Sequence, residues 1–220
     1  MGARPSFDTE LEILNIELIR MAGLAEQAIR NSIAALTARD KEMAMSVVEH
    51  DHEVDEMEKT IETRCLKLLL RQQPVARDLR QISTALKMIT DIERIGDQAA
   101  DIAEILMNLK DEEPAKIARH IPEMARVASE MVNDSVTAFT NTDLEAAKAV
   151  IARDDVVDDL FCKVRSDLVE LIGTTPNRID EAIDVMMIAK YLERIGDHAV
   201  NICEWVEFYE TGEYKNTKLL

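Results

Sequence analysis

The chain has little of what stabilises small secreted domains or binds nucleic acids. Only three of its 220 residues are cysteine, and no two of them form a CxxC pair. Without a paired disulfide framework, Cys65, Cys162 and Cys203 are predicted to be buried thiols in a reducing cytosol. Lys and Arg number 26 against 43 Asp and Glu, for a net charge of −17. This deficit of basic residues argues against nucleic-acid binding and favours cations or basic partners.

Glycine, proline and aromatic residues are also scarce, with six Gly, five Pro, four Phe, three Tyr and one Trp. This composition is typical of a helical protein with an aliphatic, methionine-rich core. The chain has no apolar run of the roughly 18 residues that a membrane-spanning helix needs, and its acidic N-terminal stretch does not resemble a secretion signal. We therefore expect any role at a membrane to be peripheral, through a protein partner.

What the chain does have is an internal repeat. The pentapeptide Glu-Arg-Ile-Gly-Asp at 93–97 occurs again, letter for letter, at 193–197. Weaker matches extend the similarity over both halves, at an offset of 103 residues before this motif and 100 within it. Such self-similarity predicts one structural unit built twice, here residues 1–111 and 112–220, with 111–114 as the linker.

Apolar residues at three- and four-residue steps predict three helices in each half. Asp40 and Asp143 are expected to cap helices at their N-termini. Gly173 is expected to end a helix in a left-handed conformation, and Gly212 to close the last helix. Short turns between long helices favour antiparallel neighbours. The predicted fold is therefore all-α, with two tandem antiparallel three-helix bundles related by the repeat. Their helices are expected at 8–37, 41–73, 77–110, 122–139, 144–172 and 178–209.

Carboxylates recur at equivalent positions of both halves. Glu93 and Asp97 lie four residues apart, and hence about 6 Å apart on one helix face, which Asp101 extends. The second copy has Glu193 and Asp197, with Asn201 at the position of Asp101.

A second set of acids repeats on the preceding helices, where Asp51 and Asp55 align with Asp154 and Asp158. In each half, the two sets lie about 20 residues before and after the turn between their helices, so they should lie at equal height. Each bundle is thus predicted to carry four carboxylates at one level, provided that their helix faces point toward each other.

These acids have two interpretations. Surface acids on solvated helix faces are common. However, a like-charged pair at this spacing costs roughly 0.2–0.5 kcal/mol in water, and more beside an apolar core. These acids border the apolar stripe, and several have no basic residue one helical turn away. Among the exceptions are Asp55, Asp97 and Glu193, with Lys59, Arg94 and Lys190 respectively.

The carboxylates are therefore predicted to bind metal ions. Oxygen ligands favour iron, magnesium, manganese or calcium, whereas zinc is disfavoured because it prefers Cys or His, although His52 and His198 could each add a nitrogen. Gly96 and Gly196 occupy the position where di-iron enzymes have the His of Glu-x-x-His, which argues against oxygen activation. Either glycine could serve a close helix contact or leave room for an ion cluster.

The repeated motif, together with the stretches Phe-Asp-x-Glu-Leu at 7–11 and Met-Ala-Gly-Leu-Ala-Glu-Gln at 21–27, resembles the PhoU family over essentially the whole chain. The resemblance implies a cytoplasmic, dimeric, negative regulator of the phosphate-starvation response. It implies contacts with the ATPase subunit of a phosphate ABC transporter and with a membrane sensor histidine kinase. It also implies multinuclear metal binding through Glu93, Asp97, Glu193 and Asp197, with a weaker second site because of Asn201.

An alternative stays open, a carboxylate-metal enzyme such as a ferroxidase or phosphohydrolase. Because the sequence offers no recognisable nucleophile–base pair or phosphate-binding loop, we expect a regulator and not an enzyme.

Overall fold

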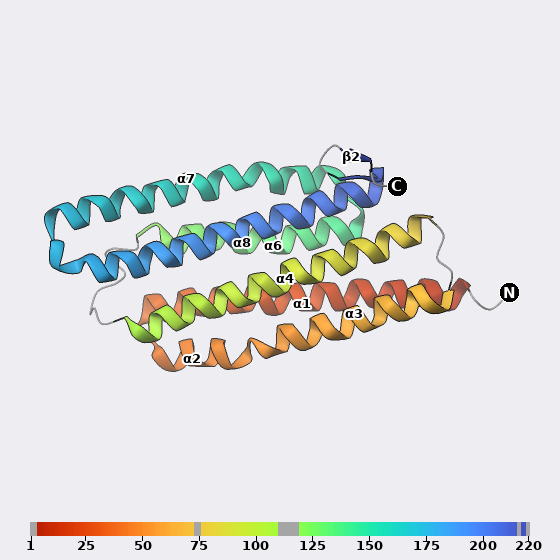
Figure 1. The fold of residues 1–220 in the computed structure, drawn as a ribbon, viewed down its shortest axis with the longest axis horizontal. Helices are drawn as coiled ribbons and strands as arrows, with labels where there is room; N and C mark the ends of the chain where they lie inside the picture. Colours follow the sequence, from red (N-terminus) through yellow and green to blue (C-terminus); the bar gives the residue numbers. More distant parts are fainter. Residues whose placement is uncertain (1–3, 73–75, 110–118, 215–216, 219–220) are drawn as a thin grey trace.

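The computed structural model describes residues 4–72, 76–109, 119–214 and 217–218, and it is built from two sets of long helices (Figure 1). The first half contains α1 (Arg4–Ala38), α2 (Lys41–His50), α3 (His52–Gln72) and α4 (Ala76–Asn108). The second contains α6 (Ile121–Asn141), α7 (Leu144–Thr174), a 3-10 turn (Pro176–Arg178) and α8 (Ile179–Thr211). A short antiparallel pair, β1 (Glu213–Tyr214) and β2 (Thr217–Lys218), follows α8.

This architecture confirms the predicted pair of antiparallel three-helix bundles, with one difference. The helix predicted at 41–73 is broken at Asp51 into α2 and α3, whereas its counterpart α7 is continuous. The predicted linker at 111–114 lies outside the described residues.

Both predicted N-caps are confirmed. The carboxylate of Asp40 accepts a hydrogen bond from the backbone N–H of Met43 at 2.9 Å, and that of Asp143 accepts one from Ala146 at 3.0 Å. Each satisfies a donor that the first helical turn leaves free. The same local chemistry thus starts the second helix of both halves.

The predicted helix ends are confirmed for Gly212 and wrong for Gly173. Gly212 ends α8 with φ of 78°, but Gly173 lies inside α7, which continues to Thr174. Pro176 explains that later end, because the residue before a proline disfavours helical backbone. The turns before α2 and α7 instead place non-glycine residues in the left-handed region, Arg39 at φ 59° and Thr142 at φ 55°.

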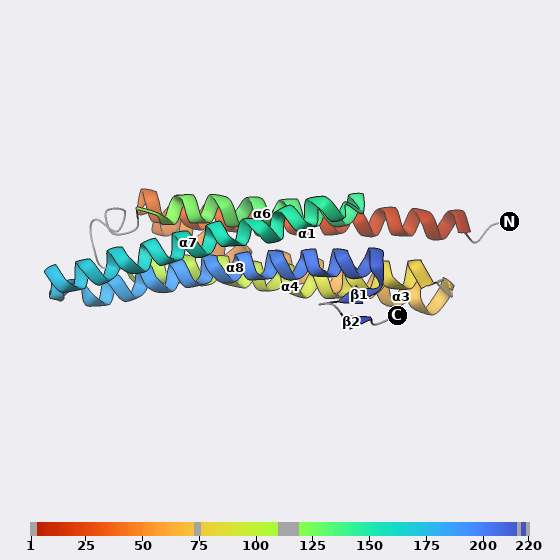
Figure 2. The same ribbon diagram turned by 90° about the horizontal axis from the view of Figure 1, so that it is seen from above.

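The two bundles lie side by side. The helix α4 runs antiparallel to α8 at the centre, and α1 lies beside α6 in a second layer (Figures 1 and 2). The repeated pentapeptides therefore lie on the two helices that join the halves.

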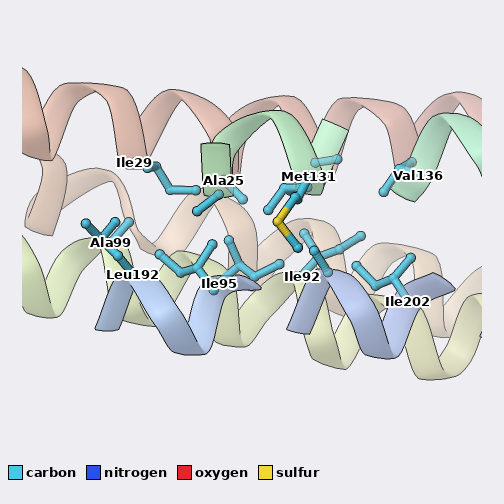
Figure 3. Close-up of a cluster of buried hydrophobic side chains, with 14 of the residues drawn as sticks. Ala25, Ile29, Ile92, Ile95, Ala99, Met131, Val136, Leu192 and Ile202 are labelled. Atoms are coloured by element: carbon cyan, nitrogen blue, oxygen red, sulfur yellow. The ribbon is translucent and has the colours of Figure 1, made fainter. Parts of the chain in front are cut away.

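One hydrophobic core fills the space between these layers. Ile29 of α1, Ile95 of α4, Met131 of α6 and Leu192 of α8 are all completely buried and belong to one cluster (Figure 3). Burying each such side chain contributes about 1.5–3 kcal/mol. Because the core crosses the boundary between the repeats, each half stabilises the other.

The cysteine prediction was right for two residues and wrong for the third. Cys65 and Cys203 are buried, and burial raises the pKa of each thiol to about 12. Cys162 is exposed on α7. No helix of the described residues combines the length and apolar character needed to cross a bilayer.

Candidate metal centre

Three carboxylates from separate parts of the first half converge. Asp51 at the break between α2 and α3, Asp55 on α3 and Asp97 on α4 each place an oxygen within 4.8 Å of the other two. All three side chains are half-buried. We call this trio the first centre. The equal-height argument predicted that these helix levels would meet, and here the helix faces also point together.

Burial and mutual repulsion make the first centre electrostatically unfavourable without a cation. Burial raises the pKa of Asp51 from 3.8 to about 6, and the charges of Asp97, Asp55 and Asp101 add to the increase, against a smaller opposite effect of His52. Near pH 7 the carboxylate is nonetheless mostly ionised, because the pH exceeds its pKa. The trio therefore confines negative charge that a bound cation would neutralise.

Glu93 and Asp101 extend the first centre along α4. Burial, followed by the charge of Asp97, raises the pKa of Glu93. Asp101 reaches toward the other half, where it hydrogen-bonds Tyr191 of α8. Burial raises the pKa of Tyr191, and the charge of Asp101 and this hydrogen bond raise it further.

Basic neighbours only partly neutralise these acids. As expected, Arg94 pairs with Asp97, at 2.9 Å, and Lys190 pairs with Glu193. Lys59 pairs with Glu56 at 2.9 Å, and that contact raises the pKa of Lys59, with a smaller contribution from the charge of Asp55. Arg94 is itself largely exposed, so a cation could displace it from Asp97 at little cost.

Glu58 is a nearby acid that the repeat did not identify. Burial raises its pKa, with further increases from Glu62 and Asp55. Its counterpart at the offset of 103 is Phe161, so comparing the halves could not find it. The available signal was its position three residues after Asp55, on the same face of α3.

The two helix-interior glycines make room for carboxylates. A methyl group on Gly96 would lie 3.4 Å from Asp51 Oδ1 and 3.3 Å from Val54 Cγ1. A methyl on Gly196 would lie 3.0 Å from Asp154 Oδ1. Both glycines therefore serve a close helix contact, and an acid of the neighbouring helix lies in that contact.

The second half has a looser version of the same arrangement, which we call the second centre: Asp154 and Asp158 on α7, with Glu193 and Asp197 on α8. Burial and then Asp158, Asp197 and Glu193 raise the pKa of Asp154 to about 6. However, Asp158 and Asp197 are exposed, and no three acids of the described part of this half bring their oxygens as close as the first centre does.

The two histidines considered as ligands have other partners. His198 Nδ1 lies 2.8 Å from Asp91 Oδ1 on α4, and Asn201 Nδ2 donates to the same oxygen at 3.3 Å. His52 Nδ1 lies 2.7 Å from the carbonyl oxygen of Glu49. Asn201 therefore supplies an amide donor between the halves, where an Asp would bring a second carboxylate against Asp91.

The donor set of the first centre suits a hard cation. Its oxygens belong to carboxylates that are partly shielded from water. They come from the α2–α3 break, from α3 and from α4. Magnesium, manganese, calcium and iron accept such oxygen ligands.

Comparison with known proteins identifies related sequences along most of the chain. The PhoU domain family model matches twice, at residues 18–106 and 121–206. A phosphate-specific transport system accessory protein PhoU homolog of Clostridium acetobutylicum is 36% identical over 211 residues, 96% of each chain. A homolog so named in Aquifex aeolicus is 38% identical over 185 residues, 84% of each chain.

Solved structures show the same architecture. The crystal structure of PhoU from Pseudomonas aeruginosa superposes with a TM-score of 0.89 at 32% identity, over 94% of this chain and 100% of that one. The phosphate transport system regulatory protein PhoU from Streptococcus pneumoniae superposes with a TM-score of 0.88 at 28% identity, over 94% and 98% of the chains.

Proposed function

The chain belongs to the PhoU family, and we propose from this that it is a metal-binding helical regulator of phosphate uptake. It acts in the cytoplasm, as a homodimer, by binding and not by catalysis. It contacts the ATPase subunit of a phosphate ABC transporter and a membrane sensor histidine kinase, and it represses the phosphate-starvation response. The names of its relatives, which describe accessory proteins of a phosphate-specific transport system, support this role.

The observation that carries the metal-binding part is the convergence of Asp51, Asp55 and Asp97 within 4.8 Å. Three half-buried carboxylates at this distance repel one another, and Arg94, which pairs with Asp97, is exposed. A magnesium, manganese or iron cation removes this repulsion and accepts their oxygens directly. The second centre binds more weakly, because two of its acids are exposed and the Asn201 amide donates to Asp91.

Cation binding in the first centre would affect the contact between the two halves. A cation in the first centre ties the α2–α3 break to α4, which is also the helix that contacts α8. A ligand that binds the folded state alone stabilises it by about 2.7 kcal/mol at a hundred times its Kd. The bound cation thus restrains the helices through which the two halves contact each other. The conformation of the surface that partners bind therefore depends on whether the cation is bound.

The metal-binding part is tested by measuring metal content and Mn²⁺ affinity of purified protein by elemental analysis and equilibrium dialysis. Asp51→Asn/Asp97→Asn is expected to abolish high-affinity binding. The matched control Asp159→Asn/Asp180→Asn removes two exposed acids elsewhere and is expected to bind as the wild type does. Equal metal content in all three proteins would refute the first centre.

The partner-binding part is tested by capture of the purified transporter ATPase subunit and the kinase cytoplasmic region, with and without Mn²⁺. We expect capture by the wild-type protein and weaker capture by Asp51→Asn/Asp97→Asn. Failure to capture either partner under both conditions would contradict the regulatory role.

A further inference from the structure

The two halves differ at Asp51, where the first half has a break between α2 and α3. At Asp51 the backbone N–H bonds the carbonyl of Val48 at 3.4 Å, and the Asp51 carbonyl accepts from Val54 at 3.0 Å. Both bonds span three residues and so replace the four-residue pattern of an α-helix. The aligned Asp154 lies within the continuous helix α7.

The two histidines that flank Asp51 bond to the end of α2. His50 Nδ1 lies 2.6 Å from the carbonyl oxygen of Ser46, and His52 Nδ1 lies 2.7 Å from that of Glu49. Because a carbonyl only accepts, each imidazole must donate its Nδ1–H. The Glu49 carbonyl lies in the last turn of α2, where backbone carbonyls lack intrahelical partners, and the His52 side chain satisfies it. The Ser46 carbonyl that His50 contacts lies four residues before His50 in the same helix.

The second half lacks this arrangement. The residues aligned with the two histidines are Arg153 and Asp155, and Arg153 instead pairs with Asp134 of α6 at 2.8 Å. The half with the histidines has the break and the compact trio. The half without them has a continuous helix and no such trio among its described residues.

We propose that His50 and His52 are positioning residues of the first centre. By donating to carbonyls at the end of α2, they hold the break in the geometry that brings the Asp51 carboxylate to Asp55 and Asp97. This inference rests on the proposed cation centre and adds the device that sets its affinity.

The packing around the break explains why it needs holding. A groove of about 210 Å³ separates this part of the chain from α1, and its walls include Gln27, Ser46, His50 and Asp51. On the other side, Asp51 Oδ1 lies against Gly96 of α4. On the groove side the break is not packed against α1, so the two imidazole hydrogen bonds are what restrains it from within the segment.

The test replaces the histidines in a protein whose second centre is disabled by Asp154→Asn/Asp158→Asn, so that Mn²⁺ dialysis and electron paramagnetic resonance report the first centre alone. His50→Leu/His52→Leu removes the donors and is expected to weaken Mn²⁺ binding by about 10-fold, as loss of groups that orient ligands does. His50→Asn/His52→Asn carries an amide nitrogen at the position of Nδ1 and is expected to bind within about two-fold of the parent, since the carbonyl contacts are kept.

The same histidine substitutions in a second parent protein distinguish a positioning role at the first centre from a general loss of structure. With Asp51→Asn/Asp55→Asn in place, only the second centre remains, and the Leu pair is expected to leave its Mn²⁺ affinity unchanged. Equal loss at both centres would overturn the proposal.

The other outcomes are equally distinct. Unchanged affinity of the Leu pair at the first centre would refute positioning while leaving the cation centre intact. Equal loss in the Asn pair would also refute it, because it would make the imidazoles act other than through the carbonyls. Absence of Mn²⁺ binding by the parent would overturn the cation centre itself, and this inference with it.

Discussion

Replacing Asn201 by Asp tests whether this residue is a degraded metal ligand or part of the contact between the halves. Asn201 Nδ2 donates to Asp91 Oδ1, which His198 also contacts. The Asp91 and His198 side chains are only 15% and 18% exposed. The substitution exchanges a donor for a second carboxylate in a poorly solvated position.

The magnitude follows from this geometry. Two unit charges about 4 Å apart repel by roughly 4 kcal/mol at an effective dielectric constant of 20. Proton uptake by the new carboxyl limits that cost, and the lost hydrogen bond adds to it. We therefore expect Asn201→Asp to lower the free energy of unfolding by about 2 kcal/mol at pH 7. For a chain of this size that lowers Tm by about 4–8 °C.

Thermal unfolding followed by circular dichroism in metal-free buffer measures this effect. The loss should shrink toward pH 4, because the introduced carboxyl, once protonated, can donate to Asp91 as the amide does. The exchange variant Asp91→Asn/Asn201→Asp restores one donor and one acceptor and should recover most of the stability. If Asn201→Asp is as stable as the wild type and its second centre binds more Mn²⁺, the contact between the halves does not explain Asn201.

Three further predictions concern packing, charge and cooperativity. Gly23→Ala should raise the free energy of unfolding by about 1 kcal/mol through helix propensity, since nothing lies within 4 Å of the added methyl. Gly196→Ala should give no such gain because its methyl meets Asp154 Oδ1 at 3.0 Å; equal gains in urea denaturation would contradict the close contact. Asp51 and Asp154 have folded-state pKa values raised from 3.8 to about 6, so the folded protein binds more protons. They favour the metal-free fold at low pH, and that contribution is lost as the pH rises from about 4 to about 6. Asp51→Asn/Asp154→Asn should therefore gain stability relative to the wild type over this range, and a constant difference would refute the assignment. Ile95→Ala should lower the free energy of unfolding by about 2–5 kcal/mol while calorimetry still shows one transition. Two transitions would mean that the halves do not share one cooperative core.

One contact shows how the repeat preserves geometry while exchanging chemistry. Arg64 on α3 bonds to Glu17 of α1 at 2.7 Å. At the offset of 103, the same positions are Asp167 and His120, whose side chains lie 3.4 Å apart. The positions stay paired while the acidic and the basic residue exchange places, so a search for conserved residue types would miss the pair.

Features that depend on neighbours within one helical turn were predictable. The caps at Asp40 and Asp143 require only a short side chain and the next three backbone donors. The alignment of acids at equal height requires only a constant helical rise and the position of the turn. For the same reason, the helices, their order and the helices that carry the acids could be inferred from residue spacing.

The break at Asp51 and the partner of Asn201 could not be inferred in this way. Each depends on what another helix places beside it: Asp97 and Gly96 beside Asp51, and Asp91 beside Asn201.

The sequence by itself determined an all-α repeat with acids at matched positions, because helical period and capping are local properties. Only the tertiary structure decided which acids meet and that the two halves share one core. Distances between helices depend on how whole faces pack, and no residue spacing along a single helix contains that information.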